Sequence, residues 1–360
     1  MSATLSLAAW TRSLNELLAG LSRPVRKAAA LLSLAVALAR HCHAGRVACA
    51  APSDAAPAST RRRLERMLGN ARLDADAVTA ALVRAFAAAW PASRRWVLIV
   101  DETDRDDRVR SLQILLAYKR RAIPIACRAY RPSGGRGIVA RVTRLLSLVR
   151  RNLPADAHVT VLADRGLSWP ALARACARLG LHYVLRVQGQ TAVWRDGEAA
   201  HDRADALAPR RPGLRTWRAR VFRVAGWVEC YFTAARTPGT REPWLLVADE
   251  PVGGRRHCRT YARRAWCEAT FRDEKSGGFG WRDSRVDDPR RATRLLVLLA
   301  LAVLLCLALG ARVVRRGLRR RLDPHAVRRI SYFQLGLRWL THDAIGAETC
   351  MPVTVPFVPP

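Results

Sequence analysis

Two different spacings of apolar residues predict helices at the start of the chain and strands in its middle. Leucines recur at helical spacing across residues 14–21, within an Ala- and Leu-rich region that extends to about residue 92. Residues 59–68 predict a basic helix with its leucines and methionine inward, and Asp74 is placed to cap a further helix that ends before Pro91. The pattern therefore predicts a helical region at residues 1–92.

From residue 96 the apolar positions form continuous short runs, which is typical of buried strands. Two of these runs, residues 96–100 and 159–163, are each followed directly by an aspartate, Asp101 and Asp164. The other elements expected here are strands at 112–118, 122–130 and 182–187, a Gly-rich turn at 133–135, and helices at 138–152 and 170–179. Three meandering strands followed by alternating helix and strand predict an α/β fold with a mixed sheet flanked by helices.

Residues 189–257 interrupt this pattern with alternating apolar and polar positions. They predict a β-rich insertion, with a hairpin around Gly226 and a further strand at 244–248. The predicted organisation is a helical region (1–92), a first part of the core (93–188), the insertion (189–257), the rest of the core (258–311) and a basic carboxyl-terminal region with a Pro-rich tail (312–360).

A Leu-rich segment, residues 295–311, contains no charged residue. It reaches the short limit for a membrane-spanning helix, and a helix buried on all sides has the same composition. We favour the buried helix, and no membrane partner, because the rest of the chain has the composition of a soluble protein.

The chain has a net charge of +33 and a pI of about 11.5. Arginine supplies nearly all the positive charge, since Lys27, Lys119 and Lys275 are the only lysines. Arginine binds phosphate oxygens in bidentate fashion and stacks on bases, so this excess favours a nucleic acid as partner over a membrane surface. The exposed face of the basic helix offers candidate DNA contacts, with an ordinary solvated basic surface as the alternative: Arg61, Arg62 and Arg63.

Nine scattered cysteines with no C-x-x-C pair argue against a zinc site and against a disulfide framework. The eight histidines show no metal-binding spacing on a helix. Charged residues interrupt the amino-terminal segment, which argues against a secretory signal and favours the cytoplasm. A phosphate-binding G-x-x-x-x-G-K-[ST] loop is absent from the sequence, so an NTPase is disfavoured.

One predicted helix places four functional side chains on a shared face. At about 100° per residue, Tyr261, Arg264, Glu268 and Lys275 fall within about 60° of one another. A single acid framed by two cations and a phenol suits a helix that holds a metal ion beside a phosphate backbone. The alternative is an ordinary exposed helix with an Arg264–Glu268 pair.

Strand-end acids offer a second part of the same site. If the strands ending in Asp101 and Asp164 are neighbours, their carboxylates converge, and Glu268 completes a three-carboxylate site suited to Mg²⁺, with Mn²⁺ also possible. A strand-end aspartate can also simply cap the following turn. Three further acids compete with Asp101 but lie in a charged loop: Asp104, Asp106 and Asp107.

Tyr261-x2-Arg264-x3-Glu268-x6-Lys275, preceded by LIVDETD around Asp101 and LADRG around Asp164, resembles the signature of bacterial insertion-sequence transposases of the DDE family. The resemblance spans roughly residues 60–340. It implies a ribonuclease-H-like core, with the β-rich segment inserted between the second aspartate and the glutamate.

The resemblance also implies functional roles. Asp101, Asp164 and Glu268 are expected to be the catalytic metal ligands, and Tyr261, Arg264 and Lys275 to contact phosphates of the transposon end. The implied reaction is Mg²⁺-dependent cleavage at terminal inverted repeats, often through a hairpin, followed by strand transfer into target DNA. The enzyme is expected to act as a homodimer on paired ends, in the bacterial cytoplasm at the nucleoid. The alternative is a catalytically inactive, DNA-binding relative that acts as a repressor.

One position departs from the family pattern. Many relatives have Trp directly after the signature arginine, whereas this chain has Ala265 there and Trp266 next. The family is also expected to use a tryptophan of the insertion to stabilise a flipped base. Three tryptophans are candidates, with packing as the alternative for each: Trp217, Trp227 and Trp244.

Overall fold

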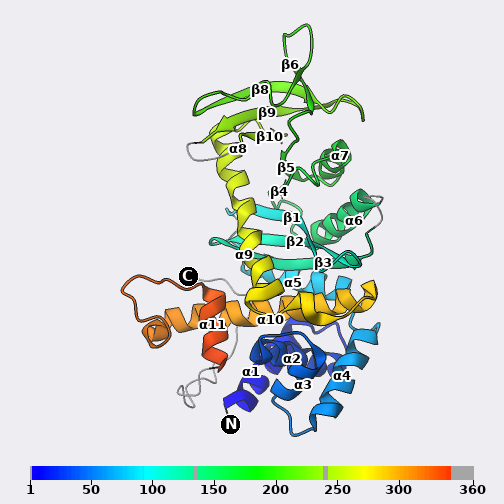
Figure 1. The fold of residues 1–360 in the computed structure, drawn as a ribbon, viewed down its shortest axis with the longest axis vertical. Coiled ribbons are helices and arrows are strands. Elements are labelled where there is room, and N and C mark those ends of the chain that lie inside the picture. Colours follow the sequence, from blue (N-terminus) through cyan, green and yellow to red (C-terminus); the bar gives the residue numbers. More distant parts are fainter. Residues whose placement is uncertain (1, 92, 133–136, 238–241, 342–360) are drawn as a thin grey trace.

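The computed structural model describes residues 2–91, 93–132, 137–237 and 242–341. One sheet of ten strands runs through them, in the order β3-β2-β1-β4-β5-β10-β9-β8-β6-β7 (Figure 1). The Gly-rich turn predicted at 133–135 and the Pro-rich tail lie outside the described residues.

The first three strands form the predicted antiparallel meander: β1 (Trp96–Asp104), β2 (Arg110–Tyr118) and β3 (Arg121–Tyr130). A tight turn joins β2 to β3, and both of its residues, Lys119 and Arg120, have positive φ, 43° and 63°. Positive φ at both central residues is typical of the turn that matches strand twist in two-residue hairpins.

Two parallel strands continue the sheet beyond β1, as the alternating pattern predicts. These are β4 (Val159–Ala163) and β5 (His182–Arg186). Helix α6 (Ile138–Arg151) leads from β3 to β4, and α7 (Pro170–Arg178) leads from β4 to β5. Helices α6 and α7 cover one face of the sheet, and a helical segment that begins at Gly254 crosses the opposite face (Figure 1). Because helices cover both faces, the central strands are apolar at nearly every position.

The β-rich insertion extends this sheet beyond β5. Its strands are β6 (Ala192–Arg195), β7 (Asp202–Arg203), β8 (Gly213–Val221), β9 (Val228–Arg236) and β10 (Trp244–Ala248). Strands β8 and β9 form the expected hairpin, and Gly226 in its turn has a φ of 87°. Strand β10 returns to pair with β5, so that core and insertion share one hydrogen-bonded sheet.

Five helices precede the sheet: α1 (Ser2–Leu17), α2 (Arg23–Ala39), α3 (Ala44–Ala50), α4 (Pro57–Gly69) and α5 (Ala75–Ala89). The side chain of Asp74 accepts a hydrogen bond from the backbone N–H of Asp76, which confirms the predicted cap of α5. Helices α2, α4 and α5 pack against α10 (Pro289–Arg315), and the five helices share the largest apolar core with one face of the sheet.

Helix α10 contains the Leu-rich segment. It is long and apolar enough to cross a membrane, but 89% of its most apolar window is buried inside the structure. Helices α2, α4 and α11 (Tyr332–Thr341) and strand β3 pack around it. Packing within the chain therefore accounts for its apolar length.

The helical segment across the sheet is not the uniform α-helix predicted for residues 261–275. It consists of α8 (Gly254–Tyr261), the 3₁₀ turn η1 (Ala262–Ala265), α9 (Trp266–Arg272) and the π-helical turn η2 (Asp273–Gly277). The assumption of about 100° per residue is therefore wrong at both ends of α9, because 3₁₀ and π turns wind the chain by different angles. Two further short turns are η3 (Trp281–Ser284) and η4 (Leu318–Arg321).

Candidate active site

Asp101 and Asp164 lie side by side on two neighbouring parallel strands. Asp164 directly follows β4 as predicted, but β1 runs on to Asp104, so Asp101 lies within its strand and not after the strand's end. Val100 of β1 pairs with Ala163 of β4, and each aspartate is the next residue in its chain segment. Neighbouring strands are about 4.8 Å apart, so the two carboxylates share one edge of the sheet. Asp101 is buried and Asp164 is half-buried.

One guanidinium group joins all three predicted carboxylates. Arg264 Nη2 lies 2.9 Å from Asp101 Oδ2 and 3.4 Å from Asp164 Oδ2. Arg264 Nη1 lies 3.2 Å from Glu268 Oε1. The segment that crosses the sheet carries both Arg264 and Glu268, one helical turn apart. The structure thus brings Asp101, Asp164 and Glu268 together around one cation.

This cluster holds more negative than positive charge. Burial opposes the charge of Arg264, but attraction to the carboxylates of Asp101 and Asp164 outweighs burial and raises the pKa of Arg264 above its ordinary value. Carboxylate oxygens from three residues are hard donors of the kind that Mg²⁺ and Mn²⁺ prefer. The three carboxylates therefore fit a divalent cation. In this structure the guanidinium of Arg264 is the positive charge that they surround.

Tyr261 belongs to the same cluster but is buried. Its hydroxyl donates a hydrogen bond of 3.5 Å to Asp164 Oδ1, and its ring packs edge-on against Trp244 with centroids 5.5 Å apart. Burial, and then the charge of Asp164, raise the pKa of Tyr261 well above its ordinary value. The phenol is therefore a neutral hydrogen-bond donor at the carboxylate cluster.

Lys275 does not join the cluster around Arg264. Its Nζ lies 2.7 Å from Asp104 Oδ1, at the end of β1. The π-helical turn that carries Lys275 places the preceding residue, Glu274, inside the protein, where Gln113 Nε2 donates to Glu274 Oε2 at 2.8 Å. Tyr261, Arg264 and Glu268 are therefore joined by contacts within the carboxylate cluster, whereas Lys275 contacts Asp104.

Cys267 is a contact of the site that sequence reasoning missed. Its Sγ lies 3.1 Å from Asp101 Oδ2, and burial followed by the charge of Asp101 raises the pKa of the thiol well above its ordinary value. The thiol is a neutral hydrogen-bond donor to Asp101. Its position beside Glu268 in the sequence was a possible signal, but isolated cysteines have no spacing that indicates such a role.

The predicted DNA contacts Arg61, Arg62 and Arg63 are exposed on α4, among the amino-terminal helices. Arg61 Nε pairs with Glu65 Oε1 at 2.9 Å. Helix α4 lies at the end of the molecule that α1–α4 occupy, and the strands that carry the aspartates lie in its middle (Figure 1). These arginines therefore form a surface separate from the carboxylate cluster.

Each candidate tryptophan of the insertion is half-buried against another ring. Trp217 stacks on Phe232, with centroids 6.0 Å apart, and Trp227 meets Trp194 edge-on at 5.7 Å. Trp244, which contacts Tyr261, is the candidate attached directly to the carboxylate cluster.

A comparison with protein families identifies the chain. The sequence model of the Transposase DDE domain family matches residues 94–305, more than half of the chain and the whole of the carboxylate cluster. The chain belongs to the DDE transposase family. Among solved structures, it is similar to a piggyBac transposase in a synaptic complex with hairpin DNA, with 10% sequence identity and a TM-score of 0.42 over 94% of this chain and 78% of that one. No curated protein matches the chain.

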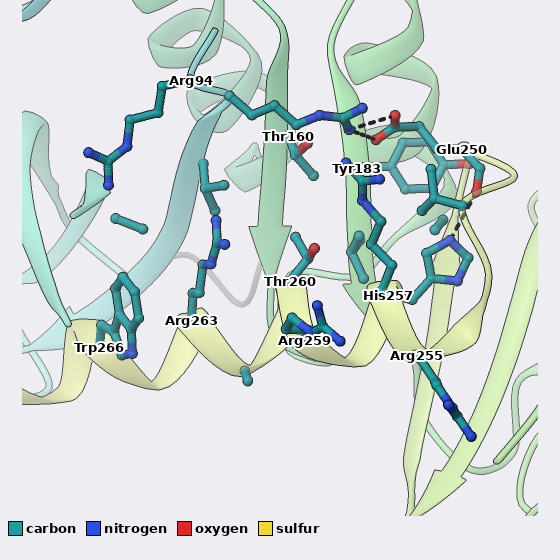
Figure 2. A pocket seen from close by; sticks show the side chains of 18 of the residues that line it. Arg94, Thr160, Tyr183, Glu250, Arg255, His257, Arg259, Thr260, Arg263 and Trp266 are labelled. Carbon is teal, nitrogen blue, oxygen red and sulfur yellow. Dashed lines mark hydrogen bonds and ion pairs between the residues drawn. The ribbon is translucent and has the colours of Figure 1, made fainter. Parts of the chain in front are cut away.

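This transposase also contains a basic cavity of about 880 Å³ on the α8 side of the sheet. Figure 2 shows its arginines projecting from α8, η1 and the segment before β1. Its cationic lining residues are Arg94, Arg95, Lys119, Arg120, Arg255, Arg256, Arg259 and Arg263. Glu250 is the acidic residue of the lining, and it is held by Arg95. The cavity is therefore suited to a polyanion such as a nucleic-acid backbone.

The transposase has a second group of potential metal ligands, which the sequence did not predict. One ligand atom each from His158, His182 and Glu250 lie within 4.8 Å of one another. Within the described residues, the acidic triad does not meet this distance, and the guanidinium of Arg264 lies among its carboxylates. The spacing of the histidines along the sequence did not indicate this pair, because strand pairing joins residues that are far apart in sequence.

Proposed function

We propose that Asp101, Asp164 and Glu268 are the catalytic carboxylates of a DNA transposase of the insertion-sequence type with a Tyr-Arg-Glu-Lys signature. The observation that carries this proposal is the contact of one guanidinium, that of Arg264, with all three acids. Three acids from separate parts of a chain are seldom gathered at one point without a function, because their mutual repulsion is unfavourable.

The three carboxylates would hold Mg²⁺, or Mn²⁺ in its place. When bound, such ions activate a water or a 3′-hydroxyl and stabilise the departing oxygen in an in-line phosphoryl displacement. Asp101 is already positioned for this role by hydrogen bonds from Arg264 and Cys267. We propose that the reaction is cleavage at terminal inverted repeats followed by strand transfer into target DNA. A hairpin intermediate is an expectation from the family resemblance.

The cations and the phenol of the signature have a role in binding DNA. Arg264, Tyr261 and Lys275 each donate to a carboxylate in this structure. With DNA bound, these donors would bind oxygens of its phosphates, Arg264 and Tyr261 at the carboxylate cluster and Lys275 beside Asp104. The basic cavity and the net charge of +33 support double-stranded DNA as the partner.

Other features of the proposal concern the whole chain. The strand order β3-β2-β1-β4-β5 supports a ribonuclease-H-like core, with residues 189–257 as its insertion. The exposed arginines of α4 support a DNA-binding role for residues 1–92. We propose a homodimer on paired transposon ends, located at the nucleoid in the bacterial cytoplasm.

Isosteric substitutions of the three acids test the proposed site. Purified Asp101→Asn, Asp164→Asn and Glu268→Gln variants should cut inverted-repeat DNA at least about 100-fold more slowly, the upper range for loss of a group that only supports a metal ligand. Cleavage in Mg²⁺ or Mn²⁺ is measured on the terminal repeats that bracket the gene, and binding is measured by fluorescence anisotropy. Asp107→Asn, an exposed acid of the neighbouring loop, is the matched control and should cut normally.

Each outcome separates the hypotheses. Full cleavage by any of the three variants removes that residue from the catalytic set. Binding of the repeats by the wild-type protein, with no nicking in either ion, would favour the inactive, repressor-like relative. Variants that neither cut nor bind, although folded, would instead assign the acids to the shape of the DNA-binding surface.

A further inference from the structure

His158, His182 and Glu250 meet at the edge of the sheet opposite to the catalytic candidates. His158 directly precedes β4, and His182 is the first residue of the parallel strand β5. Glu250 follows the end of β10, which runs antiparallel to β5, and so reaches the same edge. Asp101 and Asp164 lie at the other ends of β1 and β4, so the two groups are separated by the length of β4.

The side chains are arranged as metal ligands. His158 Nε2 lies 3.1 Å from Glu250 Oε1, and the two imidazole rings stack with centroids 4.4 Å apart and planes inclined by 20°. All three residues are half-buried, so a cation could reach them without opening the core.

A neighbouring carboxylate fixes the orientation of one imidazole. Asp249 Oδ2 lies 2.8 Å from His182 Nδ1, and Asp249 Oδ1 accepts the backbone N–H of Tyr183 at 2.8 Å. With Nδ1 held in this way, Nε2 is the nitrogen of His182 left to bind a cation. A carboxylate that holds the other nitrogen of a ligating histidine is a recurrent feature of zinc sites.

Two further contacts bear on the site. Arg95 Nη1 donates to both oxygens of Glu250, at 2.9 and 3.3 Å, and competes with any cation for this carboxylate. His158 Nδ1 is buried and has no hydrogen-bond partner in the part of the chain that the structure describes. The hydrogen bonding of His158 is therefore incomplete within the protein, which is uncommon for a buried nitrogen.

We propose that His158, His182 and Glu250 bind a transition-metal cation of the Zn²⁺ class, with Asp249 orienting His182. Two imidazole nitrogens and one carboxylate are a known zinc ligand set, whereas Mg²⁺ prefers oxygen donors. The site joins the starts of β4 and β5 to the segment that leads into α8. It is independent of the carboxylate cluster and does not rest on the proposed reaction.

Metal binding tests the proposal directly. After treatment with a chelator, the full-length protein is titrated with Zn²⁺ against a chromogenic chelator, and its Tm is measured with and without the ion. The wild-type protein should bind one Zn²⁺ ion. His158→Ala and His182→Ala should each weaken the affinity for Zn²⁺ at least ten-fold. Asp249→Asn should weaken binding about 10- to 100-fold, as for other groups that support a ligand. Bound Zn²⁺ should raise the Tm of the wild type and not of the two alanine variants.

Three controls make the result specific. His325→Ala changes an exposed histidine elsewhere and should bind Zn²⁺ as the wild type does. The triple variant Asp101→Asn, Asp164→Asn and Glu268→Gln should also retain it. Arg95→Met removes the competing cation and should tighten binding, whereas a purely structural Arg95–Glu250 pair predicts no gain. Equal Zn²⁺ affinity in wild type, His158→Ala and His182→Ala, or thiolate absorption bands with Co²⁺ that indicate cysteine ligands, would overturn the proposal.

Discussion

Glu274 is a fully buried carboxyl group whose hydrogen-bond donor is the neutral amide of Gln113. Burial raises its pKa to about 7, and the hydrogen bond from Gln113 only partly offsets this effect. Below a pH of about 4.5, folded and unfolded chains both hold this proton. As the pH rises toward 7, the unfolded chain releases the proton first, so the free energy of unfolding falls, and the loss is complete above about pH 7.

Glu274→Gln should remove this loss. The glutamine oxygen can accept the same hydrogen bond, so the variant should gain up to about 3 kcal/mol relative to wild type between pH 5 and 8, at about 1.4 kcal/mol per unit of pKa. Urea denaturation at the two pH values measures the difference. Glu229→Gln, on an exposed glutamate, should leave the pH dependence unchanged. If stability depended on pH in the same way in Glu274→Gln and in the wild type, Glu274 would not be the source of this pH dependence.

At the residue scale, the acidic residues of the candidate site could be predicted from simple rules about apolar runs and helical spacing. Asp101 and Asp164 follow uninterrupted apolar runs in the sequence, and Glu268 lies one helical turn from Arg264. The contacts of Cys267 and Glu274 were not predictable, because each depends on how tightly the crossing segment packs on β1 and β2. The pair of His158 and His182 depends on strand pairing in the same way.

Helices α10 and α11 approach each other through two glycines. A Cβ at Gly310 would lie 1.8 Å from the backbone oxygen of Tyr332, and a Cβ at Gly336 would lie 1.8 Å from that of Cys306. Backbone atoms cannot rotate away as side chains can. The close contact between α10 and α11 therefore requires glycine, which has no Cβ, at both positions.

Gly310→Ala and Gly336→Ala should each destabilise the protein by about 1–3 kcal/mol or more, the range for overpacking in a tight core. Thermal denaturation measures the effect. Gly69→Ala is the matched control at the end of α4, where nothing lies within 4 Å of the added carbon, and it should be neutral or slightly stabilising because alanine favours helix. Equal Tm values for all three variants would show that the helices can move apart at no cost.

At the element scale, strands were easier to predict than helix types. The predicted runs 159–163 and 244–248 coincide with β4 and β10, because buried strands need apolar residues at nearly every position. The change to a π turn at η2 was not predictable from spacing. It depends on burying Glu274 against Gln113, which lies in a distant strand.

Eight arginine and lysine side chains line the cavity beside α8, which makes it a region of concentrated positive charge. If DNA phosphates occupy this cavity, Arg259→Gln should weaken binding of duplex DNA and reduce the slope of log K against log salt by about 0.9 for each phosphate that the variant no longer neutralises. Fluorescence anisotropy across a salt series measures the slope. Arg151→Gln removes the same charge from α6, on the opposite face, and should change the slope less. Equal slopes for the two variants would place the DNA elsewhere.

At the scale of the whole molecule, the order of elements was predictable and their joining was not. The composition of residues 189–257 indicated strands, and the hairpin around Gly226 is present. Nothing in the sequence indicated that β10 would pair with β5. Pairing between strands so far apart in the chain depends on how the whole protein packs and not on local sequence.

The pairing of β5 with β10 limits how such a chain can be shortened. Without the insertion, β5 would become an outer strand, with a row of unsatisfied amides and carbonyls open to any neighbouring polypeptide. Trimming is therefore easier at the far end, around β6 and β7, than at β10. A shortened form of this transposase would therefore have to retain β10. Without it, the exposed edge of β5 would pair with other chains and promote aggregation.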